Sequence, residues 1–135
     1  MTTTPSRPVP RPSAISEPYW TACARHEFIV QRCRACARYV FAPQKFCRYC
    51  LADELEWVPA SGRATLYSYT IIWRPQTPAF EVPYTAGVIE LEEGYFMLSN
   101  VVECAPEDVH VGMPLEVTWL DLEGGTLPVF RPRKT

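Results

Sequence analysis

Two pairs of cysteines constrain the fold of this chain more than any other feature of its sequence. Cys33 and Cys36 form one C-x2-C pair, Cys47 and Cys50 form a second, and ten residues separate the pairs. Each C-x2-C turn brings two thiolates within reach of one ion, and two such turns on neighbouring hairpins complete a tetrahedral four-sulfur site. The pattern predicts a zinc ribbon that holds one Zn²⁺ through these four cysteines.

Two other interpretations of the cysteines stay open. The four thiols could form disulfides or remain free, but the chain begins without the apolar core of a secretion signal, and this favours metal ligation and a cytoplasmic location. Iron competes with zinc because rubredoxin-type sites also use four thiolates, and an iron-loaded ribbon would indicate electron transfer. Either ion in a closed site has no open coordination position, so the site is predicted to be structural and not catalytic. Ala37 and Leu51 stand where typical zinc turns have glycine.

Charge divides the chain near residue 50. Residues 1–50 carry eight lysines and arginines against two acids, whereas residues 51–130 carry two arginines against thirteen acids. The last five residues add three cations, and the net charge of the chain is −2. The cations interleaved with the cysteines offset the negative charge of an ion bound by four thiolates, so they need no nucleic acid to explain them.

The N-terminal part of the chain combines an arm with a short helix. Residues 1–12 hold four prolines and two arginines without hydrophobic periodicity, and they are predicted to form a flexible arm. Ser16 is positioned to cap a helix and Pro18 lies where its missing N–H costs little, so a helix is expected from there to about Arg25. Such a helix is too short to be stable alone and must dock on another part of the structure or on a partner.

The remaining sequence alternates with the period of β-strands. Short strands are predicted at 28–32 and 55–58, and five more at 63–73, 84–91, 95–102, 115–120 and 126–131. Five short strands in such a small segment favour a closed barrel of the OB type, because closure removes exposed sheet edges. The chain is therefore predicted to be mainly β, with helix and zinc ribbon in residues 13–58 and a five-stranded OB-fold in residues 59–135.

No motif in the sequence predicts catalysis. The chain lacks G-x-S-x-G, a glycine-rich phosphate loop and H-E-x-x-H, and its two histidines are isolated from any nucleophile. We therefore expect a protein that is not itself an enzyme. Single-stranded nucleic-acid binding is the alternative function for a ribbon joined to an OB barrel, but a barrel with a large excess of acids repels phosphates.

Several segments, taken in order, resemble one known family. They are the helix start at 17–20, the cysteine pairs with 39–43 between them, and the segments 55–57, 61–70, 82–84, 88–94, 111–114 and 127–132. Over residues 16–132 the chain resembles the zinc-ribbon/OB-fold acyl-CoA-associated family, formerly a family of unknown function. The resemblance implies metal ligands at Cys33, Cys36, Cys47 and Cys50, a rubredoxin-like ribbon, and no catalytic residue.

The resemblance also implies a function and partners. Members of the family are required non-catalytic subunits that associate with thiolase-like enzymes, with related acyltransferases and aldolases, or with MaoC-type enoyl-CoA hydratases of lipid metabolism. The barrel lies beside the acyl-CoA entrance of the partner, and the helix and ribbon help to bind partner subunits. A hetero-oligomer that contacts acyl-CoA, without membrane or nucleic acid, is therefore expected for this chain.

The charge distribution limits which residues are expected to contact acyl-CoA. Coenzyme A is anionic, so the acidic barrel is expected to cover the pantetheine and acyl portions while arginines or the partner hold the phosphates. The candidate ligand contacts are Arg63, Trp73, Arg74, Tyr84 and Arg131. Tyr19 and Trp20 on the helix are the candidate contacts with a partner.

Overall fold

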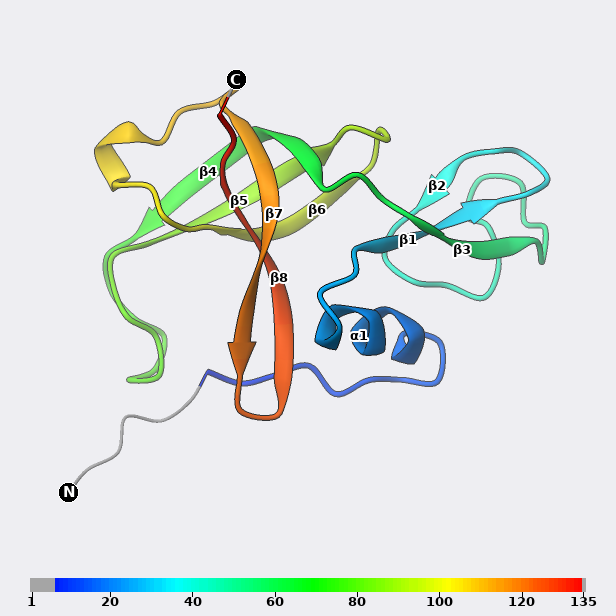
Figure 1. The fold of residues 1–135 in the computed structure, drawn as a ribbon, viewed down its shortest axis with the longest axis horizontal. Coiled ribbons are helices and arrows are strands. Elements are labelled where there is room, and N and C mark those ends of the chain that lie inside the picture. The colour runs from blue at the N-terminus through cyan, green and yellow to red at the C-terminus, as the bar shows by residue number, and fades with distance from the viewer. Residues whose placement is uncertain (1–6, 135) are drawn as a thin grey trace.

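The computed structural model describes residues 7–134, which form a small ribbon sheet, one α-helix and a barrel (Figure 1). The helix is α1 (Glu17–Ala24), and the ribbon strands are β1 (Ile29–Cys33), β2 (Tyr39–Val40) and β3 (Leu55–Pro59). The barrel strands are β4 (Arg63–Ile72), β5 (Tyr84–Leu91), β6 (Phe96–Val101), β7 (Pro114–Leu122) and β8 (Gly125–Pro132), with one 3-10 turn at Pro106–Asp108. Among these residues no helix has the length and apolar character needed to cross a bilayer.

Helix α1 begins where the sequence predicts, but its N-terminal cap differs. Ser16 occupies the cap position and makes no capping bond to the helix. Its hydroxyl instead accepts a bond from the backbone N–H of Ser13 at 2.9 Å, and the Ser13 hydroxyl accepts one from the N–H of Ser16 at 3.1 Å. The predicted capping role of Ser16 is therefore wrong, because this reciprocal serine turn uses the same hydroxyl. The helix buries Tyr19, Ala22 and Cys23.

The ribbon sheet has the strand order β2-β1-β3, with both pairs antiparallel. Among residues 7–134, the separate buried cluster of the ribbon consists of Cys33, Val40 and Cys47, while Val30 of β1 belongs to the barrel cluster. Gln31, 6% exposed, anchors the long loop after β2: its side chain donates to the carbonyl of Gln44 at 2.9 Å and accepts from the Gln44 N–H at 2.7 Å. The ribbon is thus held by few apolar side chains and by polar contacts that fix its loop.

The five strands β4 to β8 close into a barrel in the order β4-β5-β6-β8-β7, as predicted for an OB-fold. Antiparallel pairing of Arg63 with Glu116 and parallel pairing of Val101 with Phe130 complete the ring. A register shift between Leu66 and Ser68 interrupts β4. The strict alternation expected along residues 63–73 therefore fails at this bulge, which bends the strand around the barrel.

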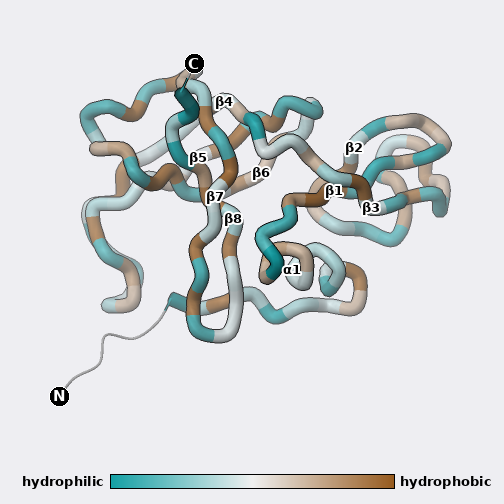
Figure 2. The backbone as a smooth tube through the Cα atoms, viewed as in Figure 1, coloured by the Kyte–Doolittle hydropathy of each residue, from teal (hydrophilic) through white to brown (hydrophobic). Residues whose placement is uncertain are grey.

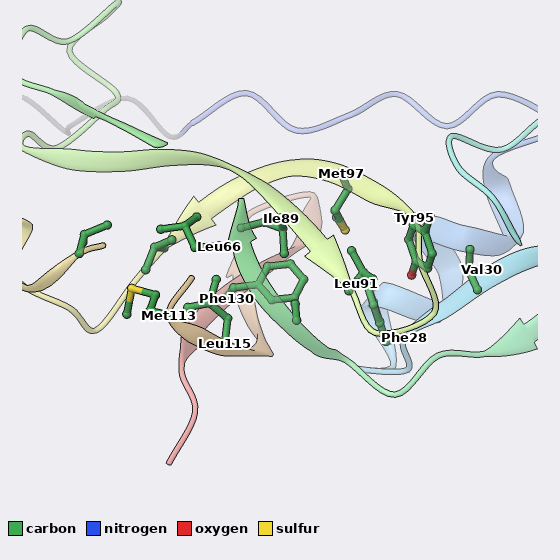
Figure 3. Close-up of a cluster of buried hydrophobic side chains, with 13 residues drawn as sticks. Phe28, Val30, Leu66, Ile89, Leu91, Tyr95, Met97, Met113, Leu115 and Phe130 are labelled. Atoms are coloured by element: carbon green, nitrogen blue, oxygen red, sulfur yellow. The ribbon is translucent and has the colours of Figure 1, made fainter. Parts of the chain in front are cut away.

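The barrel core extends into the start of the ribbon. Leu66, Ile89, Leu115 and Phe130 are fully buried, and apolar segments alternate with polar ones along the strands (Figure 2). Phe28, which precedes β1, and Val30, which lies within β1, belong to the same buried cluster. Figure 3 shows both residues toward one end of it. Shared packing therefore joins the ribbon to the barrel.

The described part of the N-terminal arm, residues 7–12, runs past the β7–β8 hairpin (Figure 1). The Arg7 guanidinium donates to Asn100 Oδ1 at 3.1 Å and lies over the ring of Phe80, 4.9 Å from its centroid. The side chain of Val9 lies against Gly125. Residues 1–6 of the predicted flexible arm lie outside the described residues, and the predicted domain boundaries stay predictions.

Candidate metal centre and binding surfaces

The two C-x2-C turns have the same backbone structure. In the first, the N–H of Ala37 donates to the carbonyl of Cys33 at 2.8 Å, and the N–H of Cys33 donates to the backbone carbonyl of Arg38 at 2.9 Å. In the second, Leu51 donates to the carbonyl of Cys47 at 2.9 Å, and the Cys47 N–H donates to the carbonyl of Ala52 at 3.0 Å. The residue after each second cysteine has a positive φ, 65° at Ala37 and 66° at Leu51. This conformation explains why glycine is typical at both positions.

The four thiol sulfurs form one compact cluster. All four Sγ atoms lie within 4.8 Å of one another, and the Cys33–Cys50 and Cys36–Cys47 pairs are each 3.6 Å apart. These separations are too long for a disulfide. A tetrahedral site with Zn–S bonds of about 2.3 Å places its sulfurs about 3.8 Å apart, so the donor set fits one Zn²⁺. Four cysteine sulfurs fill every coordination position of a tetrahedral ion, so none is left for a substrate and the site is structural.

The environment acts differently on two of the four thiols. Burial opposes ionisation of Cys47, but the backbone N–H groups of Cys50 and Tyr49 lower the pKa of that thiol to about 6. At Cys50 the backbone N–H of Ala52 favours the thiolate, but burial and the other three cysteine thiols of the cluster raise the pKa to about 12. Arg34 is paired with Glu54 at 2.8 Å, and Arg48 donates to the carbonyl of Phe41. The arginine after the first cysteine of each pair therefore binds an oxygen of the protein.

An apolar groove of about 420 Å³ lies where the helix, the ribbon and the barrel meet. Trp20 lines it from α1, and Leu98, 78% exposed, lines it from β6. Tyr19 also borders the groove but is 3% exposed, with its ring 5.9 Å from Phe41 and 6.3 Å from that of Trp57. Of the two predicted partner contacts, Trp20 is the one with accessible surface, while Tyr19 anchors the helix to the ribbon.

A second hollow, of about 560 Å³, lies between the arm, the loop after β4 and the barrel. Tyr84 lines it, stacked on Phe80 at 5.7 Å and hydrogen-bonded to Gln76. Trp73 and Arg74 are exposed on the same loop and are not among the described residues that line the hollow. The structure therefore brings Tyr84 and Phe80 together and leaves the other two predicted contacts on the surface.

The predicted arginines differ in their surroundings. Arg131 is ion-paired with Glu116 at 3.0 Å and Glu103 at 3.7 Å, so its charge is already offset. Arg63 lines a shallow, polar hollow of about 280 Å³ together with Arg133. Arg7 lines the larger hollow beside Phe80, a place that the sequence could not reveal because the contact joins the arm to a distant loop.

Comparison with known proteins agrees with both parts of the fold. Residues 20–56 match the family described as ChsH2, rubredoxin-like zinc ribbon domain. Residues 57–120 match ChsH2, C-terminal OB-fold domain. Together with the sulfur geometry, these matches confirm the predictions of one structural Zn²⁺, a zinc ribbon and an OB-fold.

Individual relatives are similar over most of the chain. A probable enoyl-CoA hydratase alpha subunit from Thermomonospora curvata is 35% identical over 127 residues, which cover 93% of this chain but only 40% of the relative. A DUF35 domain-containing scaffold protein from Methanocaldococcus jannaschii is 33% identical over 97 residues, covering 70% of this chain and 69% of the relative. Among solved structures, a chain of the Ltp2-ChsH2(DUF35) aldolase superposes with a TM-score of 0.85 at 34% identity, covering 92% of this chain and 98% of its own.

Proposed function

This chain belongs to the ChsH2 (DUF35) family of zinc-ribbon and OB-fold proteins, and from that premise we propose that it is a non-catalytic accessory subunit of an acyl-CoA enzyme. The enzyme is thiolase-like, or a related acyltransferase, aldolase or enoyl-CoA hydratase. The observation that carries the proposal is the similarity to the chain of the Ltp2-ChsH2(DUF35) aldolase, which is matched along 98% of its length. The alpha-subunit and scaffold names of the sequence relatives support the same role.

The surfaces of the chain suit an accessory role. The metal centre is closed and serves to fold the ribbon, so it offers no reactive position. The apolar groove beside Trp20 is a place where a partner could bury apolar surface, because exposed patches of this kind mark interaction sites. The free cysteines fit a reducing compartment, and the proposal includes a cytoplasmic location.

Within the complex, we expect the loop after β4 to contact acyl-CoA. Trp73, 68% exposed, and Tyr84 would contact the pantetheine arm, and Arg74 would approach a phosphate. Arg63 is the second candidate for a phosphate contact, whereas Arg131 would first have to leave Glu116 and Glu103. The acidic character of the barrel leaves the remaining phosphates to the partner enzyme.

The ligand contacts can be tested in the assembled complex. Replacing Arg74 with alanine should weaken acyl-CoA binding about tenfold, because a charge-assisted hydrogen bond is lost. Arg25→Ala is the matched control, since this arginine follows helix α1, far in sequence from the loop after β4, and is paired with Glu27. Unchanged acyl-CoA affinity in the Arg74 variant would remove it from the ligand site.

The accessory role is tested by purification of the tagged full chain from its native host, at moderate salt and after nuclease treatment. We expect a stoichiometric thiolase-like, acyltransferase, aldolase or hydratase partner, identified by mass spectrometry. Recovery of the chain without any acyl-CoA enzyme, or with bound RNA when nuclease is omitted, would contradict the proposal.

A further inference from the structure

The two cysteine turns share a backbone but differ in the side chains that they present. The first turn carries the small residues Ala35 and Ala37, whereas Tyr49 and Leu51 occupy the equivalent positions of the second. Tyr49 is 51% exposed and Leu51 is 77% exposed, and Phe46 beside them is 48% exposed. We call these three residues the ribbon tip. Metal binding does not require it, because the first turn is built the same way without large apolar side chains.

Leucine at position 51 is unfavourable for two local reasons. Its φ of 66° is in the left-handed region, which sterics disfavour for residues with a Cβ. Its side chain is also an apolar group left in water, so neither the fold nor the solvent favours leucine here. Glycine would remove both costs. Strain that the fold does not need points to a function for the side chain.

Cations outnumber acids around the ribbon tip in the sequence. Residues 28–52 contain five lysines and arginines and no acid. Arg38 lies 4.8 Å from the centroid of the Tyr49 ring, and Lys45 lies 5.5 Å from that of Phe46. Asp53 is the nearest acid in sequence, and Glu54 after it is neutralised by Arg34. The tip is therefore an apolar surface with a basic border, and its complement is an apolar surface with an acidic border.

We propose that the ribbon tip binds an apolar depression bordered by carboxylates on the enzyme subunit, with Leu51 as the residue inserted most deeply. This inference rests on the proposed accessory function and names the surface and the chemistry of the partner. The ribbon lies to one side of the barrel, so its tip can be buried by an enzyme without covering the loop after β4 (Figure 1).

A protein partner fits the tip better than a nucleic acid. The cations beside the Tyr49 and Phe46 rings would suit either kind of partner, so the distinction rests on Leu51. Leu51, the most exposed member, offers no ring for a base and gains most from burial in an apolar site.

The experiment compares two glycine variants of the full chain that relieve the same backbone strain. Leu51→Gly removes the apolar side chain, and Ala37→Gly is the matched control at the same φ in the first turn. Each is titrated against the purified acyl-CoA enzyme that co-purifies with the natural chain. We expect Leu51→Gly to weaken binding at least about tenfold and Ala37→Gly to change it less than about twofold. Both should keep one zinc per chain and a melting temperature at or above that of the natural chain.

A charge variant tests the basic border. Lys45→Glu should weaken binding to the same enzyme, and the difference from the natural chain should shrink as salt is raised. If Leu51→Gly binds as tightly as the natural chain, the ribbon tip is not the interface, although the accessory function stands. If Leu51→Gly loses zinc or melts earlier, Leu51 is a structural residue and the inference fails.

Two further outcomes also overturn the inference. If the natural chain binds no acyl-CoA enzyme, both the inference and the proposed function fail. If a fluorescent single-stranded oligonucleotide binds the natural chain and is lost in both Leu51→Gly and Lys45→Glu, the tip binds nucleic acid and not an enzyme.

Discussion

The ribbon and the barrel are stabilised in different ways. The buried cluster of the ribbon consists of Cys33, Val40 and Cys47, so two of its three members are metal ligands. The barrel cluster has thirteen buried residues, with Phe130 and Leu66 among the fully buried ones. A segment too small to bury a sufficient core can use a metal ion in its place. Zinc therefore supports the folding of this chain in the region where apolar packing is weakest.

The two regions also differ in what they present to other molecules. The ribbon, residues 28–59, carries five lysines and arginines against three acids and has exposed apolar side chains at its tip, whereas residues 60–130 carry two arginines against ten acids. They remain connected, because Phe28 packs in the barrel core and Tyr39 stacks on Tyr95 at 6.3 Å. Loss of the ribbon should therefore weaken the barrel without unfolding it.

The largest expected effect is removal of a metal ligand. Cys47→Ser should lose zinc and unfold the ribbon, because zinc contributes on the order of 10 kcal/mol to the folding of such sites. Metal analysis should give no zinc in the variant, and amide exchange should show protection in the barrel but not in the ribbon. Cys104→Ser, outside the cluster, is the control and should keep one zinc per chain. A Cys47→Ser variant that retains zinc and a folded ribbon would show that the ribbon does not depend on this ligand.

The converse change removes barrel packing and spares the metal. Phe130→Ala deletes a side chain with no exposure and should lower the free energy of unfolding by about 3–5 kcal/mol. Denaturant unfolding gives this value, and zinc content at low denaturant should stay at one per chain. Loss of zinc in the folded variant would mean that the two regions do not have separate sources of stability.

A smaller effect on stability is expected from a substitution at Gly87, which lies next to the β4 bulge. A Cβ at Gly87 would lie 2.9 Å from Leu66 Cδ1 and 3.1 Å from the Ser68 carbonyl oxygen. Gly87→Ala should cost about 1–3 kcal/mol by overpacking. Gly125→Ala is the control, since the three atoms nearest to its Cβ would all belong to the side chain of Val9 on the arm, at 3.2 Å or more. Equal losses in the two variants would show that the arm is as tightly fixed as the barrel.

The smallest effect concerns the link between the end of α1 and the β7–β8 hairpin. The ring of His26 is stacked on that of Trp119 at 5.4 Å, and its Nε2 lies 3.0 Å from Asp121 Oδ1. Hydrogen bonds from His26 and Thr126 lower the pKa of Asp121. A lowered pKa adds stability above the pKa of the unfolded state, and this stability is lost as pH falls through the folded value.

Asp121→Asn tests this link through pH. The natural chain should melt slightly above the variant at pH 6, and the difference should disappear at strongly acidic pH. Zinc is lost on acidification from both proteins, so its effect cancels in the comparison. A difference that persists at acidic pH would show that the carboxylate charge of Asp121 is not its source.

Sequence was sufficient where the signal is local and insufficient where distant segments meet. The spacing of the four cysteines predicts the metal cluster, and period-two alternation predicts all five barrel strands, with β5 at the observed bounds. The two-residue strand β2 is too short to show alternation, and the bulge in β4 arises from barrel curvature. Contacts such as that of Arg7 with Asn100 have no sequence signal, because they depend on how the arm lies on the finished fold.

The two positions where zinc turns usually have glycine could be predicted only in part. The absence of glycine at Ala37 and Leu51 is visible in the sequence, but the positive φ that makes it significant appears only in the structure. The exposure of Leu51 then distinguishes it from Ala37 and leads to the ribbon tip.

The most direct test of the accessory role is reconstitution of acyl-CoA turnover. The enzyme that co-purifies with this chain, the zinc-loaded chain, and a stoichiometric mixture would be assayed with the acyl-CoA substrate of that enzyme. We predict no turnover by the chain alone, and turnover by the mixture well above that of the enzyme alone. Turnover by the chain alone, or a mixture no more active than the enzyme, would contradict this prediction.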